Sequence, residues 1–127
     1  MTSTSQVQLP IRRRTPSRRI GMAMAAEAVT FALASAIHFG TGFTQAAIPE
    51  LVIAAVLAVG GSAVLTQRAH AWGAAVGAAA FATFGTTVGL AIIASGRQDL
   101  PDLVYHASIL TALVITLAGL ARTRPET

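Results

Sequence analysis

The sequence predicts an all-α protein: a four-helix transmembrane bundle that runs up-down-up-down with its N- and C-termini in the cytoplasm. Three observations lead there, namely an apolar composition, four apolar stretches of similar length, and arginines gathered on one side of the expected membrane. Of the 127 residues, 54% are hydrophobic and only 11% are charged. Soluble domains carry roughly 25% charged residues, so this chain is expected to face lipid.

The four apolar stretches cover residues 20–39, 47–66, 72–95 and 103–121. Each is close to the ~20 residues that an α-helix needs to cross ~30 Å of hydrocarbon. The connectors, residues 40–46, 67–71 and 96–102, are short, and short connectors predict antiparallel neighbours. Pro49 and Pro101 are each expected at a helix start, where the missing N–H of proline breaks no hydrogen bond.

The positions of the arginines predict the orientation. Five arginines precede the first apolar stretch, and Arg68, Arg122 and Arg124 are expected on the same side, whereas Arg97 stands alone on the other. Basic residues concentrate in cytoplasmic segments, so the termini and the second connector are expected there. We therefore expect a multi-pass protein of the cell membrane, with the lipid bilayer as its first partner.

The apolar stretches divide the chain into three parts. Residues 1–19 are expected to be a disordered basic cytoplasmic tail, residues 20–121 the transmembrane domain, and residues 122–127 a second cytoplasmic tail. The first tail has too little apolar surface to fold alone, and its arginines suit contact with anionic lipid. Because the net charge of +4 comes mostly from this tail rather than from a folded basic face, no nucleic-acid partner is expected.

Small residues and the absence of cysteine bear on packing and chemistry. Gly73 with Gly77, and Gly85 with Gly89, have the small-xxx-small spacing that lets helices approach closely, either within the bundle or in a homo-oligomer. The chain has no cysteine, which excludes disulfides, thiolate metal sites and the chemistry of quinone-linked disulfide oxidases.

Four ionisable residues lie inside the apolar stretches: Glu27, His38, Glu50 and His106. Such residues are expensive in lipid and usually face the interior of a bundle. The expected hairpins put His38, Glu50 and His106 at similar depth near the outer side, with Tyr105 beside them. These four residues, His38, Glu50, Tyr105 and His106, are the predicted ligand-binding candidates.

The outer residues allow several roles. Two His and one carboxylate could ligate a metal, act as acid and base on a lipophilic substrate, or relay protons. They could equally be interfacial residues without chemistry. The spacing matches no known metal signature, so no metal and no cofactor is assigned, and no catalytic residue is named. In the shared-pocket interpretation His38 and His106 are bases or ligands, Glu50 orients one imidazole, and Tyr105 is a donor at the rim.

Glu27 is a buried acid at a different depth. It precedes His38 by 11 residues, about 16 Å along a helix, and projects from the same helix face. The two residues could mark the ends of a polar track through the bundle. Alternatively, Glu27 is protonated and hydrogen-bonded to a backbone group or to a threonine, with Thr83, Thr86 and Thr87 as the candidates.

Several segments resemble small four-helix bacterial inner-membrane proteins of the DoxX-like kind. These segments are AIHFG at the end of the first stretch, AAIPELVIAAVLAVG, FGTTVGLAIIASG, and PDLVYHASIL at the start of the fourth. The resemblance covers most of residues 20–121 and implies His38, Glu50, Tyr105 and His106 as the positions of interest. Proteins of this kind are often linked to quinone-dependent respiratory or oxidative-stress systems, although no residue here indicates quinone or haem binding.

Three functions are compatible with these observations. The first is a membrane protein that binds or acts on a small lipophilic ligand at the outer His/Glu pocket. The second is an accessory subunit that packs against a larger membrane complex through its glycine-rich faces. The third is an oligomeric proton-coupled transporter that uses Glu27, which needs several copies because four helices enclose no wide pore. Whether the protein is an enzyme does not follow from the sequence.

Overall fold

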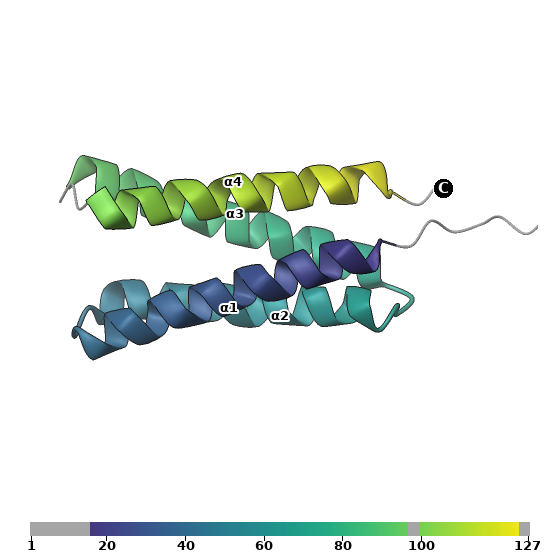
Figure 1. The fold of residues 1–127 in the computed structure, drawn as a ribbon, viewed down its shortest axis with the longest axis horizontal. Coiled ribbons are helices and arrows are strands. Elements are labelled where there is room, and N and C mark those ends of the chain that lie inside the picture. The colour runs from purple at the N-terminus through teal and green to yellow at the C-terminus, as the bar shows by residue number, and fades with distance from the viewer. Residues whose placement is uncertain (1–15, 97–99, 125–127) are drawn as a thin grey trace, which may run out of the picture.

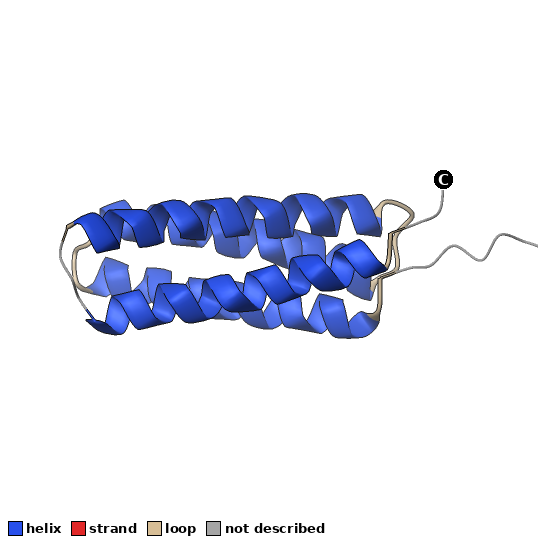
Figure 2. Cartoon of the chain, turned by 90° about the horizontal axis from the view of Figure 1, so that it is seen from above, coloured by secondary structure: helices blue, strands red, loops and turns tan. Residues whose placement is uncertain are grey.

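The computed structural model describes residues 16–96 and 100–124, and the helices given below belong to this part. Four α-helices follow one another: α1 (Arg18–Gly40), α2 (Thr44–Leu65), α3 (Ala71–Ser95) and α4 (Leu100–Arg122). The part of the chain that the structure describes contains no strand (Figure 2). Most of the predicted basic tail, Arg97 in the third connector and residues 125–127 lie outside the described residues.

Each helix is long and apolar enough to cross a membrane, with between 22 and 25 residues and a mean hydropathy of 1.7 to 2.1 in its most apolar window. This length exceeds the ~20 residues that a bilayer core requires. The prediction of an all-α protein with four helices that could span a membrane is confirmed, and these helices are consistent with a small integral membrane protein.

The helix ends differ from the prediction where polar residues continue a helix beyond its apolar part. Helix α2 begins at Thr44 rather than at residue 47, and α4 begins at Leu100 rather than at residue 103. Pro49 therefore lies inside α2 and not in its first turn, so the expectation for this proline was wrong. The apolar pattern marks the part of a helix that faces lipid, whereas backbone hydrogen bonding decides where the helix begins.

The two ends of the bundle are identified by contacts between helices. At one end, called here the His38 end, the last turn of α1 and the end of α3 lie beside the starts of α2 and α4. At the other, the Trp72 end, the Trp72 indole Nε1 donates to the carbonyl of Leu120 over 3.0 Å. The start of α1 and the end of α4 both lie at the Trp72 end (Figure 1).

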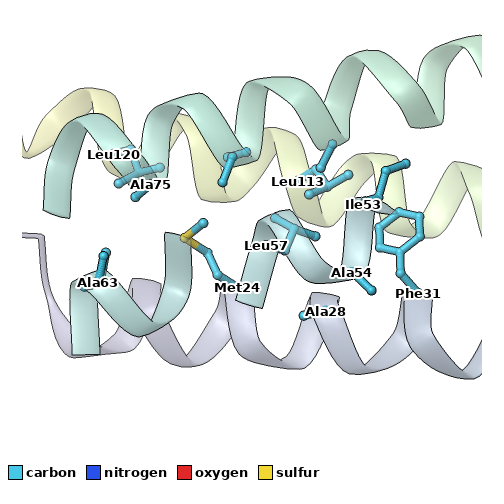
Figure 3. Close-up of a cluster of buried hydrophobic side chains, with 14 of the residues drawn as sticks. Met24, Ala28, Phe31, Ile53, Ala54, Leu57, Ala63, Ala75, Leu113 and Leu120 are labelled. Carbon is cyan, nitrogen blue, oxygen red and sulfur yellow. The ribbon is translucent and has the colours of Figure 1, made fainter. Parts of the chain in front are cut away.

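Buried apolar side chains from all four helices form one core, part of which is shown in Figure 3. Met24 and Phe31 of α1 meet Leu57 of α2 and Leu113 of α4, and all four side chains are almost fully buried. The large side chains on the outside of the helices are also apolar, among them Val29, Leu33, Val59, Phe84, Ile92 and Ile115. An apolar exterior around an apolar core suits a lipid environment.

The glycines of α3 divide into two groups. A Cβ atom added at Gly85 would lie 2.9 Å from Ile53 Cδ1, and one at Gly89 would lie 3.3 Å from the His106 ring, so these two glycines pack inside the bundle. A Cβ atom added at Gly73 or Gly77 would meet nothing within 4 Å. The two small-xxx-small pairs therefore have different environments: one pair packs between helices of this chain, and the other faces outward.

Candidate functional site

A first His–carboxylate pair joins α1 to α2 at the His38 end. His38 Nδ1 lies 2.7 Å from Glu50 Oε2, and the side chains are 18% and 6% exposed, respectively. Pro49 and Glu50 follow the polar start of α2, which places the carboxylate level with the last turn of α1. The ring of Phe43 stands edge-on to the His38 ring, with 5.6 Å between the ring centroids. A hydrogen bond through Nδ1 leaves Nε2 of His38 as the second polar atom of the ring.

A second His–carboxylate pair lies within α4. His106 Nδ1 is 3.0 Å from the carbonyl oxygen of Asp102 and 3.1 Å from its Oδ1. The spacing of four residues puts both side chains on one face of the helix. The other edge of the His106 ring, with Cδ2 and Nε2, lies against Gly89 of α3. Glycine at this position leaves room for the imidazole between the two helices.

A cavity of about 260 Å³ lies at the His38 end, bounded mainly by α2, α3 and α4. Its apolar wall includes Phe31, Phe43, Ile53, Val88, Ile92 and Ile93. Its polar wall consists of Gln45, Glu50, Thr86, Asp102 and His106. Glu50 and His106, predicted as members of one site, therefore line the same cavity, whereas His38 reaches that cavity only through its bond to Glu50.

Acceptors predominate among the polar groups of the cavity. Glu50 Oε1 is buried and has no hydrogen-bond partner among the described residues. Pro49 has no N–H to donate to the carbonyl of Gln45, one turn earlier in α2. The Thr86 hydroxyl donates its proton to Ala82 over 2.8 Å, so it offers only acceptor capacity to the cavity.

Tyr105 has a different position from the one predicted. Its ring packs edge-on against Phe31 and against His106, with centroid distances of 6.3 Å and 5.2 Å. The hydroxyl is buried and has no partner among the described residues, and Tyr105 does not line the cavity. The expectation of a donor at the rim is therefore corrected: Tyr105 helps to position the His106 ring from inside the bundle.

Glu27 lies in the bundle interior between α1 and α4, and is 5% exposed. The Thr116 hydroxyl donates to Glu27 Oε1 over 2.7 Å, while Oε2 is buried without a partner among the described residues. A threonine partner was expected, but on α3 rather than on α4. The hydroxyls of Thr83, Thr86 and Thr87 instead donate to backbone carbonyls one turn back in their own helix.

Sequence reasoning missed Asp102 as the partner of His106 and Thr116 as the partner of Glu27. The four-residue spacing of Asp102 and His106 was a usable signal, because residues at this spacing meet on one helix face. No comparable signal pointed to Thr116, since 89 residues separate it from Glu27. Among the residues that the structure describes, no group of three or more His, Asp or Glu side chains is arranged to hold a metal ion.

Comparison of the chain with protein-family models, with curated proteins and with solved structures gives no match. Function is therefore argued from the site alone.

Proposed function

We propose that this chain crosses the bacterial inner membrane four times, up-down-up-down, and binds a small lipophilic ligand in the cavity at the His38 end. The observation that carries the ligand proposal is an apolar cavity lined by Glu50, whose buried oxygen Oε1 has no hydrogen-bond partner among the described residues. Ligand sites are typically apolar hollows in which a few polar groups fix the orientation. A buried acceptor without a donor is costly unless a ligand or water satisfies it.

The proposed orientation has both termini in the cytoplasm and the His38 end outside. It is supported by the concentration of arginine, eight of nine residues, in the segments assigned to the cytoplasmic side. The pattern of the DoxX-like proteins also supports a bacterial inner membrane. A reporter that is active only in the periplasm should be silent when fused after Thr127. Activity of that fusion would reverse the proposed orientation.

A small neutral photolabel tests the cavity. Phenyl-trifluoromethyl-diazirine, added to the protein in lipid nanodiscs, should label Ile53 and Thr86, two buried residues of the cavity wall, above the level at outward-facing residues. Ala46→Phe places a large ring in the cavity wall and should reduce that labelling. Ala80→Phe makes the same change at an exposed position on α3 outside the cavity and should leave it unchanged. Equal labelling of wild type and Ala46→Phe would contradict a ligand site here.

An accessory subunit, or a homo-oligomer, is the second candidate. It is favoured by the outward position of Gly73 and Gly77, which gives α3 a smooth exposed face near the Trp72 end. Small residues on a lipid-facing surface allow another helix to approach closely. The variant Gly77→Cys should then crosslink to a neighbouring helix in native membranes. The control Ala107→Cys, at an exposed position on α4, should not. Absence of any crosslink at position 77 would remove this candidate.

A further inference from the structure

We infer that the ligand of the cavity is a lipophilic ammonium ion whose N–H groups donate to the Glu50 carboxylate, because the cavity combines an acceptor-rich polar wall with two aromatic side chains. The inference rests on the proposed ligand-binding function and adds the chemical class of the ligand. It follows from the supply of donors and acceptors, the charge of the wall and the composition of the apolar part.

The buried polar groups of the cavity wall offer more hydrogen-bond acceptors than donors. Glu50 Oε1 has no donor among the described residues, and the backbone carbonyl of Gln45 lacks the N–H that Pro49 cannot provide. The side-chain amide of Gln45 carries N–H donors but is exposed, so the excess of acceptors concerns the buried residues of the wall. The Nδ1 position of His106 is already engaged by Asp102, and the Thr86 proton is engaged by Ala82. The group that complements this wall is therefore a donor with several protons, and an ammonium group is such a donor.

The charged residues of the cavity wall also favour a positively charged ligand. Two carboxylates, Glu50 and Asp102, line the cavity, and no Arg or Lys does so among the described residues. Each carboxylate lies beside one imidazole, that of His38 or His106, so the wall carries net negative charge when these imidazoles are neutral. Glu50 is 4% exposed, so a charge on it is poorly solvated. A buried charge is tolerated when an opposite charge with hydrogen bonds accompanies it. A cationic ligand supplies that charge, and a neutral ligand does not.

The apolar part of the wall also fits a cation with a hydrocarbon body. Ile53, Val88 and Ile92 offer a surface for the hydrocarbon, while Phe31 and Phe43 both belong to the same wall. The face of an aromatic ring attracts an ammonium group that lies within about 6 Å of the ring centroid. His38 acts here as a positioning residue, because its hydrogen bond to Oε2 fixes the Glu50 carboxylate and leaves Oε1 free.

A pair of probes of equal shape tests the charge. Cyclohexylmethylamine, protonated at pH 7, and the neutral cyclohexylmethanol compete with the diazirine photolabel for Ile53 and Thr86 in nanodiscs of zwitterionic lipid. The potency of each probe is expressed as its concentration in the membrane, so that a difference in lipid partitioning between the two probes does not affect the comparison. In wild type the amine should protect the cavity at a concentration roughly tenfold or more below that of the alcohol, the factor expected for one charged hydrogen bond.

Two matched variants locate the preference. Glu50→Gln keeps the size of the side chain and removes its charge, and should bring the two probes to equal potency. Glu27→Gln makes the same change at a buried acid that does not line the cavity, and should keep the preference for the amine. If Glu50→Gln does not insert into membranes, Asp102→Asn removes the other carboxylate of the wall and should reduce the preference.

The outcomes separate the two proposals. The ammonium inference is overturned if amine and alcohol are equally potent in wild type, or if the preference for the amine survives Glu50→Gln. The ligand site is still upheld in either case if Ala46→Phe reduces the photolabelling. Protection by neither probe, together with labelling that ignores Ala46→Phe, overturns both proposals. An amine preference that is present in wild type and Glu27→Gln and lost in Glu50→Gln supports the inference.

Discussion

The two ends of the bundle are packed in opposite ways. At the Trp72 end α2 approaches its neighbours at backbone distance: a Cβ atom added at Gly60 would lie 2.7 Å from Ala78 Cβ, and one at Gly61 would lie 3.2 Å from the carbonyl oxygen of Gly21. At the His38 end the facing residues include Phe31, Ile53, Glu50 and His106, and a cavity of about 260 Å³ remains between the helices.

One bundle thus combines a closely packed end with an end that keeps a cavity between its helices. Apolar lipid offers little hydrophobic drive for helix association, so close packing of small residues supplies much of the stability. Larger and polar side chains at the other end prevent that close packing. The Trp72 end is therefore expected to carry most of the stability, and the His38 end the chemistry.

The largest effect is expected from Gly60→Val. The added side chain meets the rigid Cβ of Ala78 and the nearby carbonyl of Ala74, so α2 and α3 must move apart. Overpacking of this kind costs roughly 3 kcal/mol. Thermal unfolding in detergent, followed by circular dichroism, should show a markedly lower midpoint for the variant.

Gly77→Val is the control for this first prediction, because a Cβ atom at Gly77 meets nothing within 4 Å. Its midpoint should stay close to that of wild type. Similar losses in both variants would mean that the cost comes from valine in α3 or α2 as such and not from close packing at the Trp72 end.

A smaller effect is expected between the two ends, at the hydrogen bond of Thr116 to Glu27. Thr116→Val removes the donor to Glu27 Oε1 and leaves both Glu27 oxygens without a partner among the described residues, which should lower stability by about 1 kcal/mol. Glu27→Gln keeps an acceptor for Thr116 and should insert and fold normally. Thr111→Val is the control, because the Thr111 hydroxyl is exposed and bonds only to the carbonyl of Ala107. A variant Glu27→Gln that fails to insert, with rescue by Glu27→Asp, would show that the charge itself is required.

The number and type of helices could be predicted from the sequence because ~20 apolar residues in a row have few alternatives. The first residue of each helix was harder to predict, as Thr44 and Pro49 illustrate. Polar residues and a proline are compatible with a helix that extends past the apolar stretch. The contact of His38 with Glu50 was within reach, since a short hairpin brings the end of one helix beside the start of the next.

Hydrogen-bond partners on helices far apart in the sequence could not be predicted from residue spacing. To predict Thr116 of α4 as the partner of Glu27, rather than a threonine of α3, one must know how each helix is rotated about its own axis. This rotation depends on the packing among all four helices. The burial of the Tyr105 hydroxyl has the same origin. Spacing predicted that Glu50 and His106 share a depth and one site, and both line the cavity, but it did not predict that Tyr105 lies outside the cavity wall.

The smallest effect on stability is expected from Gly89→Ala, which tests the glycine of the His38 end. The new methyl group would lie 3.3 Å from Cδ2 and Nε2 of His106, a tight contact that the ring can relieve by moving a few tenths of an ångström. The gain in helix propensity, roughly 1 kcal/mol, offsets this strain, so the unfolding midpoint should change little. The His106 imidazole shifts, measured by nuclear magnetic resonance in nanodiscs, should nevertheless move clearly. Gly73→Ala adds the same methyl group to an open face and should leave those shifts in place. A destabilisation of Gly89→Ala as large as that of Gly60→Val would mean that the glycines of both ends serve backbone packing, and the distinction between the two ends would not hold.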